Sequence, residues 1–258
     1  MDSFSRLVEI MARLRAPDGC PWDKKQTHQS LRPYLIEESA EVLQAIENQD
    51  MRNLCEELGD LILQPIFHAQ IAADAGNFTL DDVLTGICEK LVRRHPHVFG
   101  DASAQNAEEV ISNWEAIKRQ EKAKRGEEIT SVLGEIPTEL SALSSALKIS
   151  KRAAKVGFEW EKEADVLAKL REETLEIEEA LQHETKERVS EEIGDLLFTA
   201  VNLARWRGIN PEMALRDVNR KFIARFEKME AEAKTRELEL ESLTPKEWDE
   251  LWNRAKSI

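Results

Sequence analysis

The feature that most constrains this chain is an acidic motif that occurs twice. Glu37–Glu41 reads Glu-Glu-Ser-Ala-Glu, and Glu172–Glu176 reads Glu-Glu-Thr-Leu-Glu. Sixteen positions after the last glutamate of each copy come Glu57–Asp60 and Glu192–Asp195, so that matched residues stay 135 positions apart. Chance rarely keeps such a register across two motifs. The sequence therefore indicates two duplicated structural units.

The chain around the motifs has the pattern of helices. Only 10 glycines punctuate 258 residues, and few segments show the β-branched alternation that is typical of strands. Apolar residues recur at helical spacing, as in Leu54, Leu58, Leu61 and Ile62 and again in Val189, Ile193, Leu196 and Leu197. We therefore predict an all-α fold, which excludes a doubly wound nucleotide-binding sheet.

A charged stretch lies between the two copies. Residues 118–128 are rich in lysine, arginine and glutamate, and Gly134 and Pro137 follow them. This composition is typical of a connection between helical units. We predict two domains, residues 1–125 and residues 137–258, each with one copy of the acidic motif.

Each copy can bring four carboxylates together. Residues three apart share a helical face, which pairs Glu38 with Glu41 and Glu57 with Asp60. The turn-forming residues 48–50 would fold the two helices back on each other. The corresponding set in the second copy is Glu173, Glu176, Glu192 and Asp195. Converging carboxylates repel one another unless a cation lies among them, and hard oxygen ligands suit Mg²⁺, with Mn²⁺ as a substitute.

Acidic helix faces are often simply solvated, and that interpretation is the alternative to a metal site. Here the apolar residues Ile193, Leu196 and Leu197 surround Glu192 and Asp195, and carboxylates beside a core stripe need a partner. An alternative function follows from the solvated interpretation. It is a non-catalytic helical module whose acidic faces dock a regulatory or other basic protein.

Basic side chains that suit phosphate groups are also present. Lys221 and Arg225 lie one helical turn apart, as do Lys90 and Arg94 in the first copy, where the separation between copies has changed to 131. Arg188 lies one turn before Glu192 and could join them. No glycine is followed by lysine, so the chain has no P-loop, and a triphosphate would be held by metal and basic side chains.

Charge and cysteine content limit the partners. Acidic residues exceed basic ones by 50 to 36, and a net charge of −14 opposes a sequence-independent grip on nucleic acid. The three cysteines form no Cys-x-x-Cys pair, and no stretch approaches the run of about 18 apolar residues that spans a membrane. The N-terminus also lacks the apolar core of a signal peptide. We expect a cytoplasmic protein without nucleic-acid or membrane partners.

The duplicated pattern Glu-Glu-x-x-Glu followed by Glu-x-x-Asp resembles the MazG family of nucleoside triphosphate pyrophosphohydrolases. Cys20–Asp23, Arg93–Phe99 and Gly157–Trp160 look like other segments of its bacterial two-domain members. The resemblance implies two tandem MazG-type helical domains whose four-helix-bundle cores are completed by homodimerisation. It also implies magnesium-dependent hydrolysis of many nucleoside triphosphates, with ribose or deoxyribose, to nucleoside monophosphate and pyrophosphate.

The resemblance also implies roles for individual residues of the second copy. Glu173, Glu176, Glu192 and Asp195 would hold the metal, with Glu173 and Glu192 also serving catalysis. Glu172 would either support these ligands or activate water. Lys221 and Arg225 would bind phosphates, helped by Arg188, and Asn219 suits a sugar or phosphate contact. Trp252 either stacks on a base or packs in the core.

The two copies differ at positions that bear on activity. Pro65 lies five residues after Asp60 in the first copy, and Ala200 lies five residues after Asp195 in the second. The proline predicts a kinked helix beside the first site. Cys88 in the first copy matches Asn219 in the second. We therefore predict that the C-terminal copy is the main catalytic unit. The N-terminal copy would be a second active site, a regulatory site or a dimerisation unit.

Overall fold

The computed structural model describes residues 2–124 and 131–256, and its regular elements in these ranges are all helical. The chain divides into two compact units, Met1–Glu127 and Glu128–Ile258. The predicted all-α fold is confirmed. Cys20, Cys55 and Cys88 are all free thiols. Within the described ranges, no helix combines the length and the apolar character that crossing a membrane requires.

The N-terminal unit contains seven helices among its described residues. They are α1 (Ser3–Arg15), α2 (Pro21–Lys25), α3 (Arg32–Glu47), α4 (Met51–Asp74), α5 (Leu80–Arg94), α6 (Pro96–Phe99) and α7 (Ala107–Lys124). Helices α3 and α4 form a hairpin, and α1 packs on α4. The core lies where these elements meet, at Met11, Leu31, Ile66 and Phe67.

The turn between α3 and α4 follows from its sequence. Gln49 adopts a left-handed conformation with φ of 55°. The side chain of Asp50 then accepts hydrogen bonds from the backbone N–H groups of Arg52 and Asn53, which caps α4. A short side-chain-capped turn of this kind reverses the chain direction and sets the two acidic helices against each other.

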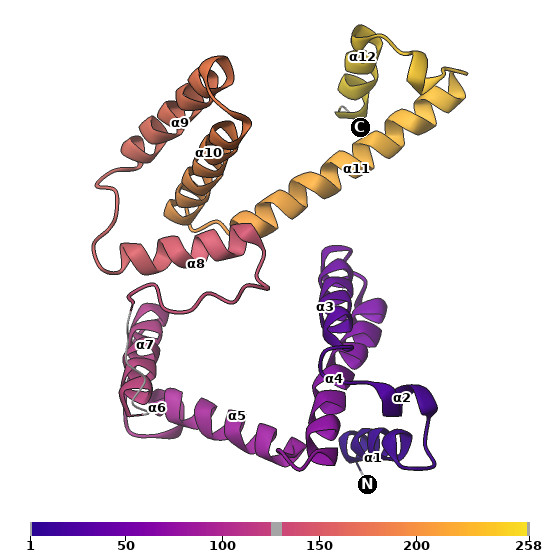
Figure 1. The fold of residues 1–258 in the computed structure, drawn as a ribbon, viewed down its shortest axis with the longest axis vertical. Coiled ribbons are helices and arrows are strands. Elements are labelled where there is room, and N and C mark those ends of the chain that lie inside the picture. Colours follow the sequence, from indigo (N-terminus) through magenta and orange to yellow (C-terminus); the bar gives the residue numbers. More distant parts are fainter. Residues whose placement is uncertain (1, 125–130, 257–258) are drawn as a thin grey trace. The chain divides into compact units, whose positions relative to one another are not determined.

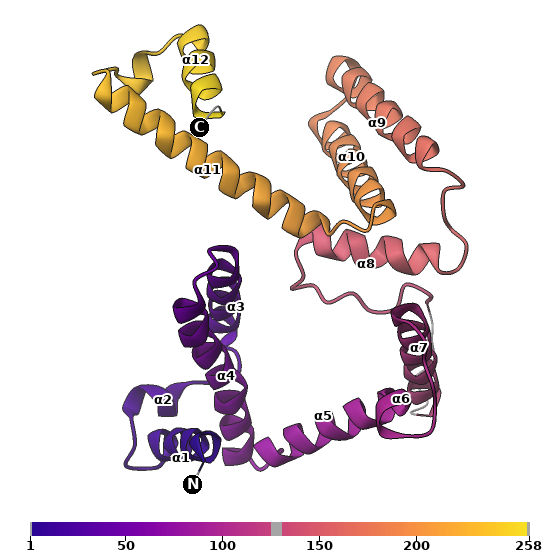
Figure 2. The same cartoon turned by 180° about the vertical axis from the view of Figure 1, so that it is seen from behind.

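The C-terminal unit repeats the hairpin with two helices of equal length. Its elements are α8 (Ala142–Ala154), α9 (Glu163–His183), α10 (Lys186–Trp206), α11 (Pro211–Thr235), a 3-10 turn at Leu240–Ser242, and α12 (Pro245–Lys256). Figure 1 and Figure 2 both show α9 and α10 side by side, with α8 across one end of the pair. Helix α12 folds back on α11 and forms a second core with Met229, Ala233, Leu251 and Ala255.

One local prediction needs revision. The charged stretch expected to connect the domains is helical as far as Lys124, because lysine, glutamate, glutamine and alanine favour helix and Glu121 is anchored by arginines from α5. Residues 125–130 lie outside the described part of the chain. Helix α4 runs through Pro65 to Asp74, and the kink expected at this residue stays a prediction.

Candidate metal and substrate site

The α9–α10 hairpin positions the carboxylates of the second motif. Helix α10 begins after Thr185, whose hydroxyl caps it by accepting from the backbone N–H of Arg188 at 3.4 Å. The two helices run antiparallel, so Glu173 on α9 faces Glu192 and Asp195 on α10. One carboxylate oxygen from each of these three residues lies within 4.8 Å of the others.

Burial distinguishes this triad from an ordinary acidic surface. Glu173 and Glu192 are each only 3% exposed, while Asp195 is exposed at the edge. A buried carboxylate is costly unless it is paired or ligates a cation. Three oxygen donors of this type fit a hard divalent cation such as Mg²⁺. The residues present therefore fit the metal that the acidic motif implies.

Two other acidic residues of the motif lie outside the triad. Glu176 is partly exposed and is not one of the three residues whose oxygens converge. Glu172 is 59% exposed in its side chain and pairs with Lys169 at 2.7 Å. The structure therefore brings together Glu173, Glu192 and Asp195, and it places Glu176 and Glu172 at their margin.

Lys169 is a cation that the sequence reasoning missed. Its Nζ lies 2.7 Å from Glu172, 3.0 Å from Glu173 and 3.8 Å from Glu176. Hydrogen bonds to Glu172 and then to Glu173 raise the pKa of Lys169, so the ammonium stays charged. The spacing of three, four and seven residues on one helix was the available signal.

Arg188 supplies the second positive charge beside the triad. Its guanidinium pairs with Glu192 and, at 2.9 Å, with the exposed Glu191. Lys169 and Arg188 thus offset part of the negative charge that the buried carboxylates carry. Each cation therefore pairs directly with one buried carboxylate of the triad.

The N-terminal hairpin holds a corresponding cluster. Oxygens of Glu38, Glu41 and Glu57 lie within 4.8 Å of one another, and Asp60 lies outside this group. Burial and then the negative charge of Asp60 raise the pKa of Glu38. Burial and then the charge of Glu41 raise the pKa of Glu57. Glu38 and Glu57 are therefore weaker acids than isolated glutamates.

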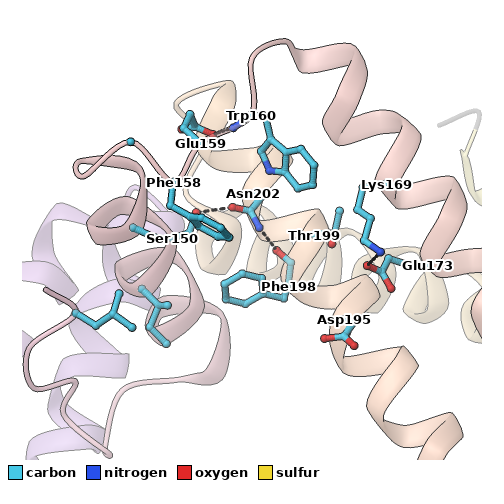
Figure 3. Close-up of a pocket in the computed structure, with 14 residues that line it drawn as sticks. Ser150, Phe158, Glu159, Trp160, Lys169, Glu173, Asp195, Phe198, Thr199 and Asn202 are labelled. Carbon is cyan, nitrogen blue, oxygen red and sulfur yellow. Dashed lines mark hydrogen bonds and ion pairs between the residues drawn. The ribbon is translucent and has the colours of Figure 1, made fainter. Parts of the chain in front are cut away.

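A cavity of about 600 Å³ opens beside the C-terminal triad. Glu173, Asp195 and Lys169 line one side of it, and Ser150, Asn202 and the ring of Trp160 lie on the other, as Figure 3 shows. Phe158, which is 83% exposed, stands at its margin. The volume falls within the range of about 300–1,000 Å³ that is usual for small-molecule sites.

The basic residues predicted on α11 lie elsewhere within the unit. Asn219 and Lys221 are exposed, and the guanidinium carbon of Arg225 lies 5.6 Å from the centre of the Trp252 ring on α12. Among the described residues that line the cavity, none belongs to α11 or α12. A single chain therefore brings Arg225 and Trp252 together, but it does not bring them to the triad.

Fold and site together define a class: an all-α protein of two repeated helical units, each presenting a carboxylate cluster able to hold a metal ion. Residues 26–99 and 161–229 both match the MazG nucleotide pyrophosphohydrolase domain. These two ranges contain the two hairpins described above. The chain belongs to the MazG family.

Curated relatives match nearly the whole of this chain. The chain is 47% identical to the nucleoside triphosphate pyrophosphohydrolase/pyrophosphatase MazG of Thermotoga maritima over 98% of this chain and 95% of that protein. It is 45% identical to the nucleoside triphosphate pyrophosphohydrolase of Escherichia coli K12, over 99% and 98% of the two chains. An uncharacterized Bacillus subtilis protein, YabN, is 48% identical over 98% of this chain and 51% of its own length.

Proposed function

We propose that this protein hydrolyses nucleoside triphosphates to nucleoside monophosphate and pyrophosphate, using Mg²⁺, or Mn²⁺ in its place, bound in the C-terminal unit. The observation that carries the proposal is the triad of Glu173, Glu192 and Asp195, two of them buried, beside a cavity of nucleotide size. The names of the Thermotoga maritima and Escherichia coli relatives support the same activity.

A divalent cation bound by the triad would neutralise phosphate oxygens and lower the pKa of bound water. Burial restricts the rotamers of Glu173 and Glu192, which would hold their carboxylates in position for the metal. Asp195 would complete the set of metal ligands from the exposed side. Lys169 and Arg188 stabilise negative charge that develops on the departing pyrophosphate. Glu172 is exposed and pairs with Lys169, and in this proposal it would either support the metal ligands or accept a proton from water.

The site we propose is completed in a homodimer. Large apolar side chains lie uncovered on the helices of the C-terminal unit: Leu175 and Leu181 on α9, Leu197 on α10, and Val218, Phe222 and Ile223 on α11 are all more than half exposed. Apolar surface of this extent favours burial against another protein surface. A second copy would cover it, and its α11 would supply Lys221 and Arg225 to the phosphates.

Product analysis tests the proposed reaction. The purified protein should convert ATP and dATP with Mg²⁺ into monophosphate and pyrophosphate, because attack at the α-phosphorus releases both distal phosphates together. Separation of the products by ion-exchange chromatography gives the answer. Diphosphate and orthophosphate as primary products would contradict the proposal, and absence of metal-dependent turnover would favour a non-catalytic interaction module.

A further inference from the structure

A short chain of hydrogen bonds forms one side of the cavity. Arg205 Nε donates to Ser150 Oγ at 2.6 Å, and Ser150 Oγ donates to Asn202 Oδ1 at 2.6 Å. Asn202 Nδ2 then donates to the backbone carbonyl of Phe198 at 3.1 Å, as the dashed lines in Figure 3 show for the last two bonds. Ser150 and Asn202 are 3% and 9% exposed, so this chain is built into the unit rather than lying on its surface.

The chain is anchored at its far end by an ion pair. Arg205 Nη2 donates to Glu159 Oε1 at 2.6 Å, and Trp206 Nε1 donates to the same oxygen at 3.0 Å. The guanidinium of Arg205 holds the pKa of Glu159 below its usual range, so this carboxylate is charged at neutral pH. Arg205 is therefore fixed in place, with its Nε directed at Ser150.

The anchoring sets the orientation of the Asn202 amide. A guanidinium can only donate hydrogen bonds, so Ser150 Oγ accepts from Arg205 and its hydroxyl hydrogen is free to donate to Asn202 Oδ1. The Asn202 atom that faces Ser150 is the carbonyl oxygen. The amide nitrogen is then directed at the carbonyl of Phe198, which can only accept.

An oriented amide at this place retains hydrogen-bonding capacity. A primary amide carries two N–H groups and two oxygen lone pairs. The hydrogen bonds recorded for Asn202 among the described residues use one of each. One N–H and one lone pair therefore remain for a ligand in the cavity that Asn202 lines.

The rest of the cavity suits a flat ring with phosphates attached. Trp160, Phe198 and Phe158 supply aromatic surface, on which a planar base can stack. Lys169, Glu173 and Asp195 line the same cavity, so a ligand there reaches the proposed metal and phosphate groups. The aromatic surface is complementary to the face of a base, and the oriented amide is complementary to its edge. The carboxylate triad is complementary to a metal-bound phosphate.

We propose that this cavity receives the nucleobase, and that Asn202, held by Ser150 and Arg205, recognises the edge of the base. The inference rests on the proposed function and adds to it a specificity-determining residue. Each common base displays a hydrogen-bond donor beside an acceptor on its edge, and the free N–H and lone pair of Asn202 match both. The site therefore accepts all common bases, and it prefers them to a triphosphate that carries no base.

Substrates with and without a base test this recognition. Asn202→Leu keeps a similar volume but removes both hydrogen-bonding groups, so kcat/KM for ATP should fall about five- to tenfold, mainly through KM. The same variant should change kcat/KM for ribose 5-triphosphate by less than about twofold, since that substrate has no base to lose. Ser150→Ala removes one of the two hydrogen bonds that orient the amide and should produce the same pattern with about a two- to threefold loss.

A matched control and a binding experiment complete the test. Gln182→Leu removes an exposed amide from α9 outside the cavity, and it should leave kcat/KM unchanged for both ATP and ribose 5-triphosphate. AMP and ribose 5-phosphate report on the base without turnover: calorimetry should show tighter binding of AMP to the wild-type protein, and Asn202→Leu or Ser150→Ala should reduce that advantage. Equal losses on ATP and ribose 5-triphosphate, or equal affinities for AMP and ribose 5-phosphate, would overturn the inference while leaving triphosphate hydrolysis intact.

Discussion

The two units share a helical hairpin and a carboxylate cluster, yet their surroundings differ. Phe67 in α4 occupies the position that matches Asn202 in α10. Phe67 is buried and packs with Met11, Leu31 and Ile66, whereas Asn202 lines a cavity. Helix α1 packs on α4 as α8 packs on α10, so the same helical contact encloses an apolar core in one unit and a polar-sided cavity in the other.

The positive charges differ as well. Tyr34 occupies the position that matches Lys169, and Asn53 the position that matches Arg188. The N-terminal carboxylates consequently lack the two cations that flank the C-terminal triad. This difference explains why burial and mutual repulsion raise the pKa values of Glu38 and Glu57.

A third difference concerns the arginine that each unit places over a tryptophan. Arg94 lies over Trp114 at 5.7 Å, much as Arg225 lies over Trp252 at 5.6 Å. Arg94 is also held by Glu121, which pairs with Arg93 as well. For Arg225, no carboxylate partner is recorded in the described part of the chain. The two units therefore share the scaffold and the carboxylate clusters but differ in the ion pairs of the matched arginines.

The largest effect should come from the carboxylates themselves. Glu192→Ala should lower triphosphate turnover by about a hundredfold or more, because a metal ligand contributes at least as much as the groups that support it. The matching change Glu57→Ala should lower triphosphate turnover by less than about tenfold. Steady-state kinetics at saturating Mg²⁺, with circular dichroism to verify folding, compares the two variants. Equal losses of turnover would mean that both units are active and would contradict the prediction that the C-terminal unit is the main catalytic unit.

The arginines should give an intermediate effect. Arg225→Ala should raise KM for ATP about tenfold or more, because it removes a charge-assisted contact to phosphate, while Mg²⁺ affinity measured by calorimetry changes little. Arg225→Lys keeps the charge without the planar fork and should recover part of the loss. Arg94→Ala serves as the control and should leave KM within about twofold, since Glu121 already holds that side chain. A similar rise in KM for both alanine variants would remove the distinction between the two arginines.

The smallest effect concerns the stability of the N-terminal unit. Hydrogen bonds from Arg94 and then Arg93 lower the pKa of Glu121 to about 2. A carboxyl whose pKa is depressed on folding stabilises the protein above its unfolded pKa of about 4.3, and this contribution is lost as pH falls toward 2. Glu121→Gln should therefore lower the unfolding temperature at pH 7 but not at pH 2. A difference that persists unchanged at pH 2 would show that the ion pair is not its source.

Several features of this protein could be predicted from local sequence. The all-α fold follows from apolar residues at helical spacing, and the repeat follows from two motifs that keep their separation. Convergence of Glu173, Glu192 and Asp195 follows because residues three apart share a helical face and a short turn reverses the chain. Each of these predictions depends only on the spacing of residues along the chain.

Sequence patterns were less reliable wherever charge had to be interpreted. The segment expected to connect the domains is helical as far as Lys124, because charged residues with high helix propensity can serve either as a linker or as a solvated helix. Lys169 was missed because a lysine beside glutamates usually forms an ordinary surface pair. Whether such a pair matters depends on burial, which spacing alone does not reveal.

Only the tertiary structure decided what lies beside the acids. Ser150 on α8 and Asn202 on α10 are far apart in sequence, and nothing local indicates that the hydroxyl of one orients the amide of the other. The helical pattern sets which face of each helix is apolar, but helix packing determines whether the space between two faces is filled, as at Phe67, or remains a cavity, as at Asn202. The sequence by itself determined the scaffold and its carboxylates. The depth of the site was decided by contacts between distant helices, because cavities depend on the shapes of several side chains at once.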